Sequence, residues 1–101
     1  MQLILDIIGF EWDDGNRNKN RASHKVEWWE CEETFFNFPL YLFPDYEHSQ
    51  REERFFAFGR TNSNRFLTIV FTVRQKRIRV ISAREMNRRE RRMYNEKDPT
   101  L

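Results

Sequence analysis

The sequence predicts a small α+β domain in which helices pack on one face of an antiparallel meander sheet. Its 101 residues amount to about one domain, so residues 1–101 are taken as a single unit. Three β-rich segments follow one another at short spacing in the second half of the chain, as in a meander. Helical periodicity precedes them and a helix-start signal follows them. We therefore expect the element order β-α-α-β-β-β-β-α.

The chain opens with an expected strand and a short helix. Residues 3–12, LILDIIGFEW, are rich in Ile and Phe, as strands are. Asp13 and Asp14 then offer an N-cap and negative charge for the first turn of a helix. Because the residues that follow, NRNKNRASH, are polar on every side, this helix is only weakly specified by the sequence.

A more strongly specified helix follows, with apolar residues at the i, i+3, i+7 spacing of an amphipathic helix: Trp28, Cys31 and Phe35. Glu30 and Glu33 occupy its other face. The Phe38-Pro39 dipeptide ends this helix, and residues 40–43 should form a short strand before Pro44.

Residues 53–59, 65–73 and 77–83 are the expected meander strands, because they are rich in Phe, Ile, Val and Thr and are separated by short turns. In the middle strand, alternate residues share an apolar face: Leu67, Ile69, Phe71 and Val73. The last strand should place Ile78, Val80 and Ser82 on one face, opposite its arginines. One sheet face is therefore apolar and helix-covered, and the other is mixed and arginine-bearing.

The last expected element is a helix over residues 88–96. Asn87 is its N-cap and Glu90 lies three positions further on, in the form of a capping box. Met93 and Tyr94 give it only a narrow apolar edge, since much of the helix is arginine: Arg88, Arg89, Arg91 and Arg92.

Composition excludes several classes of protein. A mean hydropathy of -0.90 and 34% charged residues exclude a membrane protein. The apolar opening segment lacks the basic flank and small-residue cleavage site of a signal peptide. A single cysteine, Cys31, rules out an internal disulfide framework or a cysteine-based zinc cluster, and it fits a reducing cytoplasm. His24 and His48 do not form a close pair, so no metal site or cofactor is expected.

The charges are distributed unequally. Residues 1–50 carry four basic and ten acidic side chains, whereas residues 51–101 carry fourteen basic and six acidic ones. Fourteen of the eighteen basic residues are arginine, whose planar guanidinium suits phosphate and carboxylate groups. An anionic ligand is therefore expected on one face, with nucleic acid as the first candidate and an acidic protein as the second.

The arginines of the strands are the strongest candidates for that site. Arg54 and Arg60 share one side of their strand, Arg77 and Arg79 share one side of theirs, and Arg84 follows at its end. If these sides coincide, the guanidinium groups form a phosphate-binding surface that also stabilises a pentacoordinate phosphorane. The alternative is a solvated charged face that only aids solubility.

The other candidate residues each have two possible roles. His24 or His48 could act as a general acid or base, or could simply be exposed loop residues. Tyr94 lies one turn from Arg91, where its hydroxyl could bind a phosphate or its ring could pack the helix. The aromatic residues could stack on bases but are mostly expected in the core.

Several motifs in order resemble the BrnT toxin family, part of the RelE/ParE-like superfamily of type II toxin–antitoxin systems. They are FEWDD near the start, the DYEHS loop with EERFFAFGR, and RIRVISAREMNRRERRMYNE, together with Asn20, His24 and Val26. The similarity runs from Phe10 to Glu96, nearly the whole chain. It implies a compact toxin that cleaves RNA without a metal and slows translation. It also implies a BrnA-like ribbon-helix-helix antitoxin, through which alone the complex contacts operator DNA.

The resemblance also implies roles for individual residues. Arg60 matches the family's Gly-Arg arginine, Arg84 its SAR arginine and Tyr94 the tyrosine of its last helix. Arg54 matches the arginine of the EERF element, and His24 the histidine of a Lys-His-Gly element. Here that element reads Ser23-His24-Lys25, so the lysine is displaced and the glycine is lost. The expected catalytic set is Arg60, Arg84, Tyr94 and His24, with RNA bound by Arg54, Arg77, Arg79, Lys25 and Arg91.

The chemistry expected from these residues is attack of a ribose 2′-hydroxyl on the adjacent phosphate. Arg60, Arg84 and Arg79 would neutralise the developing charge, and the base would be one of His24, Lys25 and Glu53. Two other functions remain open: a module that binds an acidic antitoxin segment without catalysis, and a DNA-binding protein that uses the last helix as a basic arm.

Overall fold

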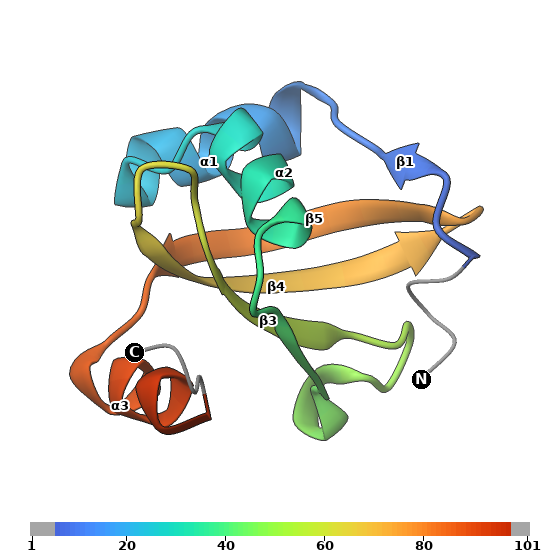
Figure 1. Ribbon diagram of the computed structural model, residues 1–101. Helices are drawn as coiled ribbons and strands as arrows, with labels where there is room; N and C mark the ends of the chain where they lie inside the picture. The colour runs from blue at the N-terminus through green and yellow to red at the C-terminus, as the bar shows by residue number, and fades with distance from the viewer. Residues whose placement is uncertain (1–5, 98–101) are drawn as a thin grey trace.

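The computed structural model describes residues 6–97 and contains one five-stranded sheet with three α-helices (Figure 1). The strand order is β1-β5-β4-β3-β2. The strands are β1 (Gly9–Phe10), β2 (Tyr41–Pro44), β3 (Phe55–Arg60), β4 (Phe66–Arg74) and β5 (Arg77–Glu85). The helices are α1 (Asp14–His24), α2 (Trp28–Phe36) and α3 (Arg88–Lys97), with a short 3-10 helix, η2 (Tyr46–His48). The predicted α+β class is confirmed, and the three meander strands begin and end within two residues of the predicted positions.

The first strand is much shorter than predicted among the residues described. Residues 3–5 of the predicted strand lie outside the described range, and among residues 6–12 only Gly9–Phe10 pairs with the sheet, parallel to Arg77 and Ile78. The chain leaves the sheet after the backbone N–H of Glu11 donates to the Ile78 carbonyl at 2.8 Å. The sheet is therefore antiparallel except for this one parallel pair.

Two buried asparagines of α1 take over the edge of β5 that β1 leaves open. The Asn16 side-chain amide donates to the Val80 carbonyl at 3.3 Å, and Asn20 Oδ1 accepts from the Ala83 N–H at 3.0 Å. These bonds satisfy backbone groups that would otherwise lack a strand partner. The helix buries polar rather than apolar side chains, which explains why it has no apolar periodicity. The Asp13 cap of this helix is confirmed, with its side chain accepting from the Asn16 N–H.

The helices divide between the two faces of the sheet rather than all covering one. α1 and α2 lie on the face that holds the core, where Phe71 packs edge-on against Phe35 of α2. α3 lies on the opposite face, as Figure 1 shows, because Tyr94 packs against Tyr41 and Phe66 there. We refer to these as the core face and the α3 face. None of the helices within residues 6–97 is long and apolar enough to cross a membrane.

A β-bulge in β5 decides which of its side chains face α3. Val70 pairs with Ser82 but Phe71 pairs with Val80, so Ile81 is an extra residue without a direct partner. The alternation reverses there, and Ala83 joins Ile78 and Val80 in the buried core. The prediction that Ser82 shares a face with Ile78 and Val80 is therefore wrong, because strict alternation does not continue through a bulge.

Candidate nucleic-acid interface

The strand register brings two of the predicted arginines to one end of the α3 face. Arg60 ends β3 and pairs with Phe66, and Arg84 pairs with Thr68 two residues further along β4. Directly paired residues in an antiparallel sheet point to the same face. From strand spacing and rise, the Cα atoms of Arg60 and Arg84 are about 12 Å apart. Arg84 reaches this face because of the bulge at Ile81.

Helix α3 adds more groups to the same end of the sheet. The Cζ atom of Arg91 lies 4.0 Å from the centroid of the Phe66 ring, a cation–π contact. Glu90, one residue earlier, hydrogen-bonds Thr68 at 3.0 Å. Arg60, Arg84, Arg91 and Glu90 thus surround the beginning of β4, and we call this group of four the arginine cluster.

Glu90 holds the guanidinium of Arg84 in a fixed orientation. Arg84 Nη1 and Nη2 donate to Glu90 Oε1 and Oε2 at 2.7 and 2.8 Å. Burial alone would raise the pKa of Glu90, but hydrogen bonds from Arg84 and the Asn87 backbone outweigh it, so the pKa is lowered. The hydrogen bond to Glu90 raises the pKa of Arg84. Both groups are therefore charged at neutral pH.

The predicted capping box of α3 places Glu90 for this contact. The Asn87 N–H donates to Glu90 Oε1 at 2.9 Å, and the Glu90 N–H donates to Asn87 Oδ1 at 2.8 Å. The reciprocal bonds fix the first turn of the helix. The sequence signal that starts the helix therefore also orients an arginine of the adjacent strand.

Arg60 lies on the other side of the cluster, beside the chain that leads from α2 to β2. Its Nη2 donates to the Phe38 carbonyl at 2.9 Å, and its own carbonyl accepts from the Asn37 side chain at 2.9 Å. An open groove of about 530 Å³ borders this guanidinium, lined by Asn37, Phe38, Arg60, Thr61, Asn62 and Asn64. The groove gives an extended polar ligand access to Arg60.

Tyr94 is buried beneath the cluster. Its exposed fraction is 0%, its ring packs between Tyr41 and Phe66, and its hydroxyl donates to the Pro39 carbonyl at 2.6 Å. Of the two readings from the sequence, this geometry favours packing. The residue attaches α3 to the sheet rather than presenting its hydroxyl to solvent.

Three other predicted RNA-binding arginines lie toward the opposite end of the sheet. Arg79 binds Glu11 and Asp13, each at 2.8 Å, and Arg77 is exposed next to the β4–β5 turn. A hydrogen bond from the Asn16 backbone, followed by one from Arg79, lowers the pKa of Asp13. Arg54 precedes β3 by one residue, six positions or about 20 Å along the strand from Arg60. These residues do not join the arginine cluster.

The predicted acid–base residues also lie outside the cluster. His24 is the last residue of α1, the helix on the core face, and Lys25 follows it in a left-handed conformation (φ 56). Both side chains are exposed. His48, the last residue of η2, contacts Asp45 at 3.1 Å. Glu53 is exposed, seven positions or about 23 Å from Arg60 along the chain. Within residues 6–97 there is no group of three or more His, Cys, Asp and Glu residues that could hold a metal ion.

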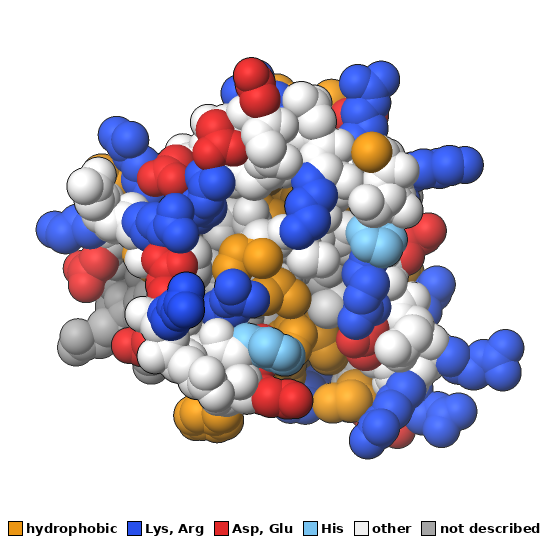
Figure 2. Space-filling model, turned by 180° about the vertical axis from the view of Figure 1, so that it is seen from behind, with side chains coloured by type: hydrophobic (Ala, Val, Ile, Leu, Met, Phe, Trp, Pro, Cys, Tyr) orange, Lys and Arg blue, Asp and Glu red, His pale blue; other side chains and the backbone are white. Residues whose placement is uncertain are grey.

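A groove between α3 and the strands β2 and β3 is not predicted by the sequence. It has a volume of about 360 Å³ and is lined by Phe43, Phe56, Phe58, Asn87, Arg89, Glu90 and Met93. The signal was present in the alternation of FFAFGR, where Phe56 and Phe58 share a face with Arg60. Phe58 is buried as expected, at 8% exposed, and Phe56 is half-buried, but both rings lie on the α3 face rather than on the core face. Seen from behind, the molecule has a hydrophobic depression with basic side chains around it (Figure 2).

Comparisons with known proteins agree with this fold. Residues 12–90 match the family model described as the ribonuclease toxin BrnT of type II toxin–antitoxin systems. Among solved structures, the chain is similar to the BrnT ribonuclease toxin of Brucella abortus, determined at 1.1 Å resolution, with a TM-score of 0.60 and 21% identity. The alignment covers 80% of this chain and 99% of the Brucella chain. No curated protein matches at a significant level.

Proposed function

The chain belongs to the BrnT family of ribonuclease toxins from type II toxin–antitoxin systems, and on this basis we propose that it cleaves RNA at the arginine cluster. The observation that carries the proposal is the arrangement of Arg60, Arg84 and Arg91 around one end of β4, on the face that α3 covers. Guanidinium groups held in place bind phosphate oxygens bidentately and neutralise charge.

The proposed reaction is internal transesterification without a metal ion. A base removes the proton of the ribose 2′-hydroxyl as its oxygen attacks the adjacent phosphorus, the bond to the 5′-oxygen breaks, and the departing 5′-oxygen takes a proton from solvent water. The products are a 2′,3′-cyclic phosphate and a 5′-hydroxyl. Arg60 and Arg84 stabilise the additional negative charge on the phosphorane, an effect worth about 10²–10³ in rate for one well-placed donor. Messenger RNA is the proposed substrate, and its cleavage inhibits translation.

Proton removal from the 2′-hydroxyl is assigned to Glu90 in this proposal. Its carboxylate is ionised at neutral pH and lies against Arg84, so a phosphate on that arginine would be close to it. His24, Lys25 and Glu53 lie further from the cluster, and Arg79 is bound by two carboxylates. Glu90 thus replaces the bases expected from the sequence.

The test is RNA cleavage by purified Arg60→Gln and Arg84→Gln proteins, with Arg51→Gln as the control for loss of one exposed positive charge at the far end of the sheet. We expect each cluster variant to lose roughly 10²–10³ in cleavage rate and the control to lose little. Circular dichroism spectra would verify folding. Near-normal cleavage by both folded cluster variants would reject the proposed site.

A second candidate function is a module that binds an antitoxin without cutting RNA. Two residues whose catalytic roles the family resemblance implies make internal contacts that favour this function. Arg84 is held by Glu90, and the Tyr94 hydroxyl donates to the Pro39 carbonyl. Incubation with messenger RNA separates the two candidates, because the module leaves the RNA intact.

The proposed partner is a BrnA-like ribbon-helix-helix antitoxin. A type II system implies a protein antitoxin, and we propose that the complex binds operator DNA through the antitoxin alone. Co-expression with the product of the adjoining open reading frame tests this. The pair should co-purify and shift operator DNA, and the toxin alone should not.

A further inference from the structure

The groove between α3 and strands β2 and β3 combines an aromatic floor with a polar rim. Phe43 and Phe58 lie side by side with ring centroids 5.3 Å apart and planes at 65°. Phe56 extends this floor and Met93, 39% exposed, borders it from α3. Phe58 is only 8% exposed, whereas Phe43 and Phe56 are half-buried, so the latter two rings offer stacking surfaces for a base.

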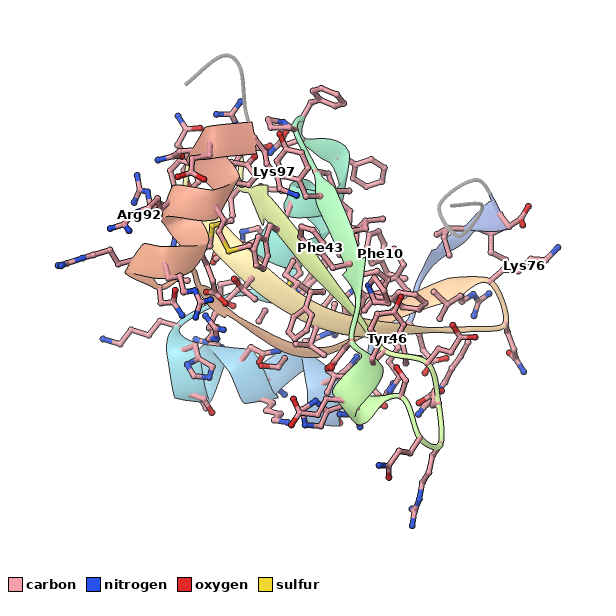
Figure 3. The ribbon with its side chains drawn as sticks, turned by 90° about the horizontal axis from the view of Figure 1, so that it is seen from below. Phe10, Phe43, Tyr46, Lys76, Arg92 and Lys97 are labelled. Atoms are coloured by element: carbon pink, nitrogen blue, oxygen red, sulfur yellow. The ribbon has the colours of Figure 1, made fainter. Side chains whose placement is uncertain are left out.

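The surroundings of the groove are strongly basic. Arg89 lines it, and the exposed side of α3 carries further arginines, of which Arg92 points away from the sheet (Figure 3). At the other end of the helix, the Lys97 ammonium lies 4.9 Å from the Phe43 ring centroid. An apolar floor with positive charge on its rim is complementary to a polyanion that carries apolar faces.

The groove is adjacent to the arginine cluster. Glu90 and Asn87 line its wall, and Glu90 bonds directly to Arg84. A nucleotide whose phosphate lies on Arg84 would therefore have its base within reach of the groove. Volumes of roughly 300–1,000 Å³ are typical of small-molecule sites, and this groove of about 360 Å³ is at the small end of that range.

From these observations we infer that the groove holds one unpaired base of the RNA strand next to the phosphate that is cut. The inference rests on the proposed function, and it specifies single-stranded RNA as the substrate. A base inside a duplex is stacked between its neighbours and cannot enter a groove of this kind. A protein segment with acidic and apolar residues is the competing occupant, and the experiment below distinguishes it.

The test measures binding of a single-stranded, 2′-O-methylated oligonucleotide, which cannot be cleaved by attack of its 2′-oxygen, by fluorescence anisotropy. Phe43→Leu removes a ring from the floor but keeps an apolar side chain. Phe36→Leu is the matched control, because Phe36 is 79% exposed on α2, across the sheet. We expect Phe43→Leu to weaken binding at least about fivefold, since a base–aromatic stack contributes about 1–3 kcal/mol. The control should bind like the unmodified chain.

Salt dependence separates stacking from charge. Phe43→Leu should leave the slope of log K against log[salt] unchanged, whereas Arg89→Gln should reduce its magnitude by about 0.7 if that arginine contacts a phosphate. A duplex of the same sequence should bind more weakly than the single strand, and Phe43→Leu should not weaken it further.

The outcomes distinguish this inference from the proposed function. Equal oligonucleotide binding by Phe43→Leu and the unmodified chain would overturn the inference. If that variant instead binds the antitoxin more weakly, the groove holds a protein segment and not a base. Weak binding by Phe43→Leu in a chain that cuts no RNA would support the groove and reject the nuclease proposal. Met93→Ala provides an independent variant if Phe43→Leu does not fold, and it should likewise weaken single-strand binding.

Discussion

The buried hydroxyl of Tyr94 provides a sharp test of how the last helix works. Its oxygen donates to the Pro39 carbonyl at 2.6 Å, and the side chain is 0% exposed. Tyr94→Phe removes this donor while keeping the ring that packs between Tyr41 and Phe66. The Pro39 carbonyl then loses the hydrogen bond from this hydroxyl.

The expected loss of unfolding free energy is about 1–3 kcal/mol, the range for a buried acceptor that loses its partner. For a domain of this size, each 1 kcal/mol lowers Tm by about 4–8 °C, so the melting temperature should fall by about 4–24 °C. RNA cleavage per folded molecule should stay within about twofold, because a hydroxyl bound to the backbone performs no proton transfer.

The assays are thermal unfolding followed by circular dichroism and RNA cleavage at a temperature where the variant is folded. Tyr46→Phe is the matched control, since Tyr46 is 85% exposed. Unchanged stability together with a cleavage rate at least ten times lower would refute the packing role and make the hydroxyl catalytic, as the family resemblance first implied.

Three further predictions follow from contacts within the fold. Glu90→Gln should lower the free energy of unfolding at pH 7 by about 1–3 kcal/mol. Because the pKa of Glu90 is lowered in the folded chain, this difference in unfolding free energy should vanish in urea titrations as the pH is lowered below about 4. Asn20→Ala should cost about 1–3 kcal/mol by leaving the Ala83 N–H unsatisfied, and faster hydrogen exchange at Ala83 should accompany it, whereas the exposed Asn18→Ala should change neither. Burial raises the pKa of Cys31 to about 12, so a thiol reagent at pH 8 should modify it only after denaturant is added, and rapid modification of the native chain would contradict this burial.

The secondary structure followed from local patterns. Alternation in β4 and the i, i+3, i+7 spacing of Trp28, Cys31 and Phe35 predicted a strand and a helix that the structure contains. The capping box at Asn87 and Glu90 was likewise visible in sequence, because its two residues are only three positions apart. Such signals depend on residues that are only a few positions apart in the chain.

The candidate site was only partly predictable. Arg60 and Arg84 were named from sequence and lie at one end of the sheet, but Arg54 and Arg79 do not join them. Parity along a strand predicts the face of a side chain, not its position along the sheet. It also fails at the bulge, whose extra residue Ile81 turns Arg84 toward α3.

The sequence alone determined the fold class, the family, the N-caps of α1 and α3, and the excess of arginine in the second half of the chain. These properties reside in composition, short-range periodicity and motifs. Only the tertiary structure decided that α3 crosses to the second face, that Asn16 and Asn20 complete the edge of β5, and that Glu90 engages Arg84. Each of these features depends on strand register, on contacts between residues far apart in the chain, or on a bend of the backbone. A local sequence pattern does not encode such contacts.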